Sequence, residues 1–126
     1  MNKEPTGGVK FLVVMLYLVG VILQAVIIYS YLSERVDLMV AAASGNIAAM
    51  RTLVNDGVNL DETDKDGKTP LMYAAEGGHV ELVKFLIENR ANPNLKAKNG
   101  KTAMMFASDK GHNQIVQILK NAGAKE

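Results

Sequence analysis

The side chains that could carry out chemistry are few, and the two histidines are the first candidates. His79 and His112 are the only histidines in the 126-residue chain, and they lie 33 residues apart. The chain contains no cysteine, which excludes a thiol nucleophile and thiolate metal ligands. The glycines, including Gly77-Gly78, do not form the Gly-x-x-x-x-Gly-Lys-Ser/Thr pattern of a phosphate-binding loop. These residues therefore predict no catalytic group, no cofactor and, unless the fold brings the two histidines together, no metal site.

The same offset of 33 residues relates a longer stretch of the sequence and accounts for the spacing of the histidines. Residues 66–79 (DGKTPLMYAAEGGH) align without a gap with residues 99–112 (NGKTAMMFASDKGH). A further shift of 33 residues toward the N-terminus places Leu38, Ala41-Ala42 and Gly45 on the corresponding positions of the first copy. A fixed period of this length is typical of stacked repeats. The sequence therefore predicts a short solenoid, a fold that usually presents a surface and rarely encloses a catalytic pocket.

The residues within each repeat resemble those of the ankyrin repeat. The second repeat contains Thr69-Pro70-Leu71, Ala74-Ala75 and Gly78-His79, similar to the family's T-P-L-H-x-A pattern and to the Gly-His step before its second helix. The resemblance implies an all-α solenoid of about three helix-turn-helix repeats, at about 33–63, 64–96 and 97–126. It also implies that both histidines are structural and buried at the start of the second helix. Side chains one repeat apart would be separated by roughly 10 Å, too far to share one metal ion, so we expect a chain that is not an enzyme.

The residues at the expected helix ends have suitable chemistry. Thr69 suits an N-cap because its hydroxyl can accept a hydrogen bond from a free backbone N–H group, and Pro70 fits the first helical position. Gly78 is expected to end the first helix in a left-handed conformation. Leu82 and Leu86 belong to an apolar stripe with helical spacing, which predicts the buried face of the second helix.

Several positions depart from the ankyrin pattern. Met72 and Met105 stand where the family has the histidine of its TPLH motif, so the hydroxyl-to-imidazole hydrogen bond of the family is absent and a loss of rigidity is expected. Arg90 stands where the family prefers glycine, as in Gly57 and Gly123. A residue other than glycine in the left-handed conformation costs on the order of 1 kcal/mol. The last helix is polar on much of its surface, which is typical of a C-terminal capping repeat.

The resemblance also implies where a partner would bind. Ankyrin proteins meet their partners on the concave side, formed by the loop tips and the outer edge of each first helix. Carried over position by position, this surface comprises Lys65, Asp66, Lys68, Glu76 and Gly77 in the second repeat and Lys98, Asn99, Lys101, Asp109 and Lys110 in the third, with Ala43 and Ser44 extending it. Its mixed charge suits a polar interface in which charge pairing sets specificity. The alternative for any one of these residues is an ordinary solvated side chain.

Tyr73 and Phe106 occupy matching positions next to Met72 and Met105. One interpretation is an aromatic and methionine strip on the concave face that contacts a partner. The other is packing between repeats, where methionine fills irregular gaps. The sequence leaves both interpretations open.

An uncharged run of 22 residues, 11–32, precedes the repeats. At 1.5 Å per residue, a helix of this length spans roughly 33 Å, enough for the hydrocarbon core of a bilayer. A three-repeat solenoid has no core wide enough to surround a helix that is apolar on every side, so we expect a transmembrane helix. A cleaved signal peptide is the main alternative, but its apolar region would be about 7–15 residues long. We therefore expect a short polar tail at 1–10, an uncleaved signal anchor at 11–32 and the repeat domain at 33–126.

One face of the expected transmembrane helix carries residues suited to a contact within the membrane. Tyr17, Gly20, Gln24 and Tyr31 follow one another at spacings of 3, 4 and 7 residues, which places them on one side of a helix. An unpaired amide near the middle of a bilayer is unfavourable, and a glycine permits close backbone approach. This face is a candidate for packing against another transmembrane helix; the alternative is a plain anchor that tolerates its glutamine.

The charges beside the apolar run predict its orientation. Lys3, Lys10 and the terminal amine precede it, whereas Arg35 follows it beside Glu34 and Asp37. By the positive-inside rule, the N-terminus stays in the cytoplasm and the repeat domain crosses the membrane. The short form with an anchor suggests a bacterial protein, in the inner membrane with its repeats in the periplasm. A cytoplasmic repeat domain is the alternative, because the difference amounts to one or two charges.

The net charge of +1 gives no overall field that would attract nucleic acid. The charge is nevertheless uneven, since residues 33–64 hold two basic and six acidic side chains and residues 65–126 hold ten basic and six acidic ones. Ordinary solvated surface is one explanation. The other is that the basic part meets an acidic partner.

Together these features predict a membrane-tethered protein–protein interaction module, an adaptor or recruiter that uses the concave ankyrin surface. The expected partners are another protein and the membrane, with neither nucleic acid nor a small-molecule substrate. The alternative is an accessory subunit of a larger membrane complex, which would dock through both the transmembrane helix and the repeats.

Overall fold

The computed structural model describes residues 6–125, and the side chains of all of these except 34–37. The chain divides into two compact units, Met1–Glu34 and Arg35–Glu126. The described residues form six helices and no strands, which confirms the all-α prediction.

The first unit contains most of the long helix α1 (Gly7–Ser44). Among the described helices, only α1 is long and apolar enough to cross a membrane, and its most apolar stretch has no buried residue. Phe11 and Ile27, for example, are 66% and 67% exposed. A signal sequence near an N-terminus meets the same criteria of length and apolar composition.

The helix α1 does not end with the apolar run at Leu32. It continues to Ser44, because no glycine or proline interrupts the sequence before Gly45. The first repeat therefore has no separate first helix, and the last residues of α1, from Leu38 onward, take that place in the second unit.

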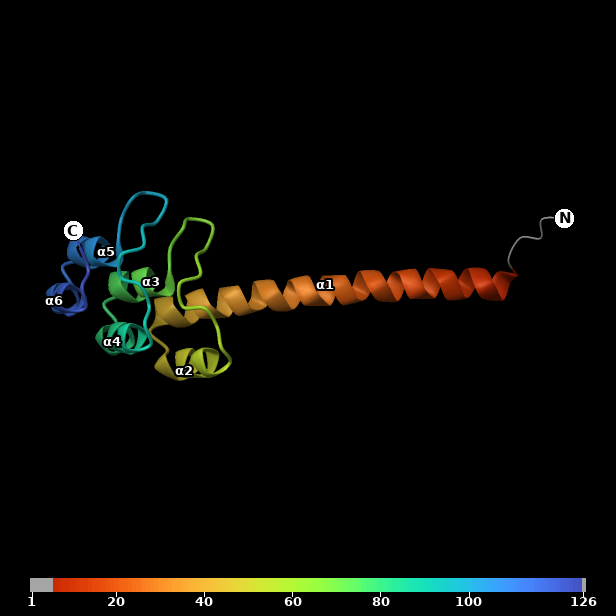
Figure 1. Cartoon of the computed structure of the whole chain (residues 1–126), viewed down its shortest axis with the longest axis horizontal. Coiled ribbons are helices and arrows are strands. Elements are labelled where there is room, and N and C mark those ends of the chain that lie inside the picture. Colours follow the sequence, from red (N-terminus) through yellow and green to blue (C-terminus); the bar gives the residue numbers. More distant parts are fainter. Residues whose placement is uncertain (1–5, 126) are drawn as a thin grey trace. The chain divides into compact units, whose positions relative to one another are not determined.

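The second unit consists of two layers of helices (Figure 1). The first layer contains the end of α1, α3 (Pro70–Glu76) and α5 (Ala103–Asp109); the second contains α2 (Ile47–Asn55), α4 (Val80–Glu88) and α6 (Asn113–Asn121). Helix α3 packs against α5, and α4 packs against both α2 and α6. The loops α2–α3 and α4–α5 project on the same side of the stack, as Figure 1 shows.

The core follows the apolar pattern of the repeats. Leu82 and Leu86 of α4 and Leu119 of α6 are at most 1% exposed. Burial of each such side chain contributes roughly 1.5–3 kcal/mol. Ala74 and Ala75 of α3 are also fully buried, and their small size allows the neighbouring helices to approach closely.

The predicted helix ends are confirmed. The Thr69 hydroxyl accepts a hydrogen bond from the Met72 N–H, and Pro70 begins α3. Gly78 has φ +74°. Arg90 has φ +68° and is the one described residue other than glycine with a positive φ, as its position in the repeat predicted.

The structure changes the expectation that methionine in place of histidine loosens the second repeat. The Met72 Sδ atom lies 3.4 Å from the Thr69 backbone N and accepts its hydrogen bond. Thr69 and Met72 therefore cap each other reciprocally, as in a capping box. The thioether has taken over an acceptor role at the start of α3, although sulfur is a weak acceptor.

Candidate functional site

Both histidines link one repeat to the one before it. The His79 Nε2 atom lies 2.8 Å from the backbone oxygen of Ala43, and the His112 Nε2 atom lies 3.0 Å from that of Glu76. Each histidine immediately precedes the second helix of its repeat, as expected, but both are half-buried rather than buried. One ring nitrogen is used in binding the preceding repeat, which gives these residues a structural role.

Glycines make room for the two imidazole rings. A Cβ atom at Gly45 would lie 2.5 Å from the His79 ring, and one at Gly78 would lie 2.8 Å from the His112 ring. Gly77, one of the predicted binding residues, is also placed against the His79 ring, where a Cβ atom would lie 2.6 Å from it. Gly77 is therefore explained by packing within the stack.

Two lysine–carboxylate pairs recur with the period of the repeat. Lys68 at the base of the α2–α3 loop pairs with Glu76 at the end of α3, and Lys101 pairs with Asp109 at an Nζ–Oδ2 distance of 2.5 Å. The Lys101 and Asp109 side chains are 45% and 51% exposed, so their pair contributes about 0–1 kcal/mol to stability. Four of the ten predicted binding residues thus pair with one another.

Two aromatic rings lie beneath these lysines. The Lys68 Nζ atom lies 4.2 Å from the centroid of the Tyr73 ring and 4.7 Å from that of the Phe106 ring. The Lys101 Nζ atom lies 5.9 Å from the Phe106 centroid. Phe106 is buried and Tyr73 half-buried, which favours packing between repeats over an open aromatic strip. The rings hold the ammonium groups by cation–π attraction.

The Tyr73 hydroxyl donates a hydrogen bond to the Asp64 carboxylate. This bond, together with burial and the nearby negative charges, raises the pKa of Tyr73 to about 12. Partial burial acts to raise the pKa of Asp64. The hydrogen bonds from Tyr73 and from the backbone N–H groups of Lys68 and Asp66 outweigh that burial, so the pKa of Asp64 lies below its ordinary value.

The α2–α3 and α4–α5 loops enclose a groove of about 310 Å³, here named the lysine groove. It is lined by Asp66, Lys68, Ala97, Lys98, Asn99 and Phe106. The two loops are joined beneath it, since the Lys98 backbone N–H donates a 3.0 Å hydrogen bond to the Asp66 carbonyl. Four of the ten predicted binding residues therefore line one groove. Lys65 and Lys110 are exposed but do not line it.

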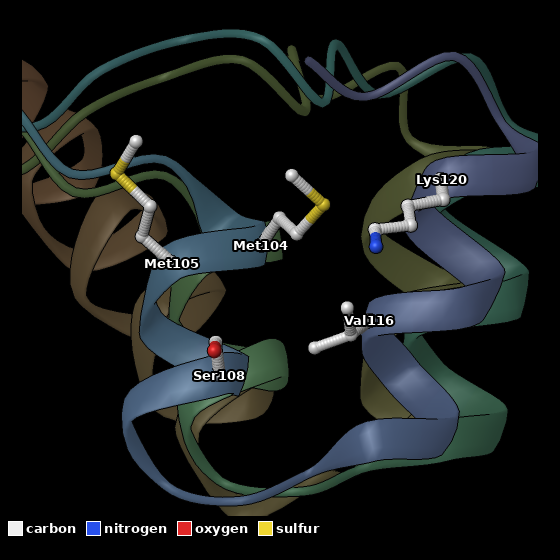
Figure 2. Close-up of a pocket in the computed structure, with 5 residues that line it drawn as sticks. All are labelled: Met104, Met105, Ser108, Val116 and Lys120. Carbon is white, nitrogen blue, oxygen red and sulfur yellow. The ribbon is translucent and has the colours of Figure 1, made fainter. Parts of the chain in front are cut away.

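A second hollow, which the sequence did not reveal, lies on the free face of the last repeat. Figure 2 shows it between α5 and α6, with Met104 and Ser108 on one side and Val116 and Lys120 on the other. It measures about 290 Å³ and also includes Met105. Val116, an apolar residue of α6 next to the buried Ile115, was the available signal.

Among the side chains that the structure describes, no group of three or more His, Asp or Glu residues is arranged to hold a metal ion. The histidines contact backbone carbonyls, and Lys68 and Lys101 pair with Glu76 and Asp109. The arrangement therefore presents fixed charges beside a buried aromatic ring, which suits recognition.

Known proteins were compared with the chain. A family model described as ankyrin repeats (3 copies) matches residues 38–126. Similar solved structures include the human ASB11 ankyrin repeat domain, with 36% identity, 70% of this chain and 40% of that chain covered and a TM-score of 0.66. Another is a chain in the complex of the Bd0816 predatory endopeptidase from Bdellovibrio bacteriovorus with immunity protein Bd3460. The sequence identity is 38%, the match covers 71% of this chain and 47% of that chain, and the TM-score is 0.68. The present chain spans less than half the length of either. No curated protein gives a significant match.

Proposed function

The chain belongs to the ankyrin-repeat family, and on this premise we propose that it is a membrane-tethered adaptor or recruiter that binds another protein through its concave surface. Ankyrin repeats form protein–protein interaction modules, so the general role follows from the family. The tether, the surface used and the adaptor role are the proposal.

The lysine groove is the observation that carries the proposal. It lies between two loops that project from the same side of the stack, and Asp66, Lys68, Lys98 and Asn99 line it. The Lys68–Glu76 pair, with side chains 15% and 32% exposed, restricts the Lys68 side chain that lines the groove, and the more exposed Lys101–Asp109 pair adds a second such contact. A surface organised before binding loses less conformational entropy on association. The remaining predicted residues, Lys65, Gly77 and Lys110, would lie at the edge of the interface.

The apolar part of α1 supports the membrane tether. Its side chains are exposed over the full width of a bilayer core, and such a surface is stable in lipid and unfavourable in water. A tether confines the bound partner near the bilayer and raises its effective concentration there. We propose a single-pass anchor at 11–32 in a bacterial inner membrane, with the repeats at 33–126 in the periplasm; a cytoplasmic repeat domain is the alternative.

A second candidate function, accessory subunit of a membrane complex, is favoured by one feature of α1. Gln24 is an exposed polar residue within the apolar stretch. On the same face, a Cβ atom at Gly20 would meet no heavy atom within 4 Å, so this site has room for another helix. Tyr17 and Tyr31 complete the face. In the role of an accessory subunit, α1 would contact another transmembrane helix, and binding to the complex would require that contact.

Crosslinking in intact membranes tests the proposed function. A photoreactive amino acid replaces Lys98 in the groove or, as the control, Lys84, which is exposed on α4. Affinity isolation and mass spectrometry should identify a protein captured from position 98 and not from position 84. Equal capture from both positions, or none, would contradict use of the concave surface.

The Gln24→Leu variant separates the two candidate functions. An adaptor should retain its captured partner, because its helix acts only as a tether. An accessory subunit should lose co-purification in detergent, because the variant removes the polar contact in the membrane. A reporter fused to the C-terminus reports on which side of the membrane the repeats lie.

A further inference from the structure

We infer that the lysine groove binds the carboxylate side chains of an acidic segment in the partner protein. The inference rests on the proposed function and adds the chemistry of the partner to it.

The charged residues of the surface fall into paired and unpaired groups. Glu76 and Asp109 are occupied by Lys68 and Lys101. Among the described residues of the predicted surface, the side chains left without an ion pair are Lys65, Asp66, Lys98 and Lys110, three basic and one acidic. Lys98 lines the groove and is exposed, as is Asp66 at its edge. Lys98 and Asp66 thus line the groove with opposite unpaired charges, and Lys65 and Lys110, outside the lining, give the surrounding surface a positive excess.

The paired lysines also retain hydrogen-bonding capacity. An ammonium group has three N–H donors, and Asp109 accepts from Lys101 through a single hydrogen bond. The Lys101 side chain is 45% exposed, so its other donors can reach a ligand. Lys98, which is exposed and lines the groove, and Lys101, whose Nζ atom lies 5.9 Å from the Phe106 ring, therefore both keep N–H donors for a carboxylate, and Lys68 lines the groove with a further positive charge.

Phe106 directs the orientation of the ligand. The face of an aromatic ring is negative and repels a carboxylate, whereas its attraction for ammonium groups is already used by Lys68 and Lys101. A bound carboxylate is therefore favoured at the lysines rather than at the ring. The aliphatic part of a glutamate side chain can cover the ring, which is 8% exposed.

The acidic side chains in this surface favour a protein over a nucleic acid. Asp66, Glu76 and Asp109 belong to the same predicted surface as the lysines. A continuous phosphate backbone would pass close to these carboxylates and be repelled. A peptide can space its carboxylates to meet the lysines and place neutral residues elsewhere.

A peptide-binding measurement tests the inference. The full chain is placed in nanodiscs of zwitterionic lipid, which leave both membrane faces accessible, and is titrated into a fluorescent peptide of alternating glutamate and serine. The expected result is saturable binding, measured by anisotropy, that weakens with added salt and is absent for the same peptide with glutamine. Absence of binding by the glutamate peptide would overturn the inference.

Matched charge variants locate the binding. Lys98→Glu in the groove and Lys84→Glu on α4 change the net charge equally. Lys98→Glu should lower the affinity at least about tenfold, equivalent to about 1.4 kcal/mol, and Lys84→Glu should lower it less than about twofold. Lys98→Gln, with half the change in charge, should give an intermediate loss and an unchanged circular dichroism spectrum. Equal losses for Lys98→Glu and Lys84→Glu, or equal affinity for single-stranded DNA, would overturn the inference.

Competition separates this inference from the proposed function. The acidic peptide should prevent photocapture of the partner from position 98. A partner that is captured equally well in its presence would overturn the acidic-segment inference and leave the proposed function standing. A groove that binds the peptide with the expected variant pattern, in a protein that captures no partner in membranes, would support the groove chemistry and contradict the adaptor role.

Discussion

The His112 side chain joins the third repeat to the second through its Nε2 atom, which donates to the Glu76 carbonyl at 3.0 Å. His79 makes the equivalent bond to Ala43, one repeat earlier. Each ring also occupies space next to a glycine with positive φ, Gly78 for His112 and Gly45 for His79. The two histidines, which are the side chains best suited to catalysis or metal binding, therefore connect neighbouring repeats of the stack.

This contact predicts unequal effects of alanine at two equivalent glycines. Gly78 and Gly111 have φ values of +74° and +76°, so alanine is strained at both by on the order of 1 kcal/mol. At Gly78 the new Cβ atom would also lie 2.8 Å from the His112 ring. We expect Gly78→Ala to lower the free energy of unfolding by about 1–3 kcal/mol more than Gly111→Ala. Urea unfolding of the full chain in detergent micelles, followed by circular dichroism, measures the difference.

A double variant provides the control. In Gly78→Ala/His112→Ala the ring is absent, so the clash term should disappear while the backbone strain remains. The two substitutions should therefore be less destabilising together than the sum of their separate effects. Additive effects would show that the imidazole does not occupy the space beside Gly78.

The sequence predicted features that depend on backbone conformation and on the repeat. Thr69 as an N-cap, Gly78 as a helix end and Arg90 in the left-handed region all follow from the residue at one position and its place in the period. Such local chemistry is readable because few residue types satisfy each requirement.

Features that depend on side-chain conformation or on the surroundings could not be read in this way. The Lys68–Glu76 pair joins residues eight positions apart, one before α3 and one at its C-terminal end, and its formation depends on the conformation of two long flexible side chains. The continuation of α1 beyond the apolar run could not be read either, because the apolar pattern stops before the helix does. The hollow beside Val116 depends on how the side chains of α5 and α6 are placed in three dimensions.

Arg90 predicts a stabilising substitution. Its φ of +68° is unfavourable for any residue with a Cβ atom, and its side chain is exposed. Arg90→Gly should therefore raise the free energy of unfolding by up to about 1 kcal/mol. Arg90→Ala retains the strained backbone and should have little effect. If both variants are equally stable in urea unfolding, the left-handed conformation is not the cause.

The reciprocal cap of α3 predicts different responses at two methionines. Met72→Leu keeps the apolar volume but removes the sulfur that accepts from the Thr69 N–H, a group in a residue only 2% exposed. An unsatisfied buried donor costs about 1–3 kcal/mol, and the weakness of a sulfur acceptor places the expected loss near the lower value. At the third repeat the cap of α5 is the Thr102 hydroxyl, which accepts from the Met105 backbone N–H.

Met105→Leu is the matched control for that substitution. The cap at Thr102 uses the Met105 backbone rather than its sulfur, so leucine at this position should change the free energy of unfolding by less than about 0.5 kcal/mol. Thermal unfolding of the two variants side by side makes the comparison. Equal losses would mean that the Met72 sulfur contributes packing alone.

The hydrogen bond from Tyr73 to Asp64 predicts loss of stability at both extremes of pH. The pKa of Tyr73 is raised from 10.0 to about 12, so its contribution is complete below pH 10 and is lost as the pH rises toward 12. The pKa of Asp64 is lowered from 3.8, so its contribution is present above that pH and is lost as the pH falls through the folded-state value.

Tyr73→Phe keeps the ring beneath Lys68 and removes the hydroxyl. The difference in unfolding free energy between the wild type and Tyr73→Phe should therefore be constant near neutrality and shrink above pH 10. The tyrosinate absorbance of the wild type should show a component near pH 12 that this variant lacks. A difference that stays constant across the alkaline range would show that the Tyr73 proton is not held by Asp64.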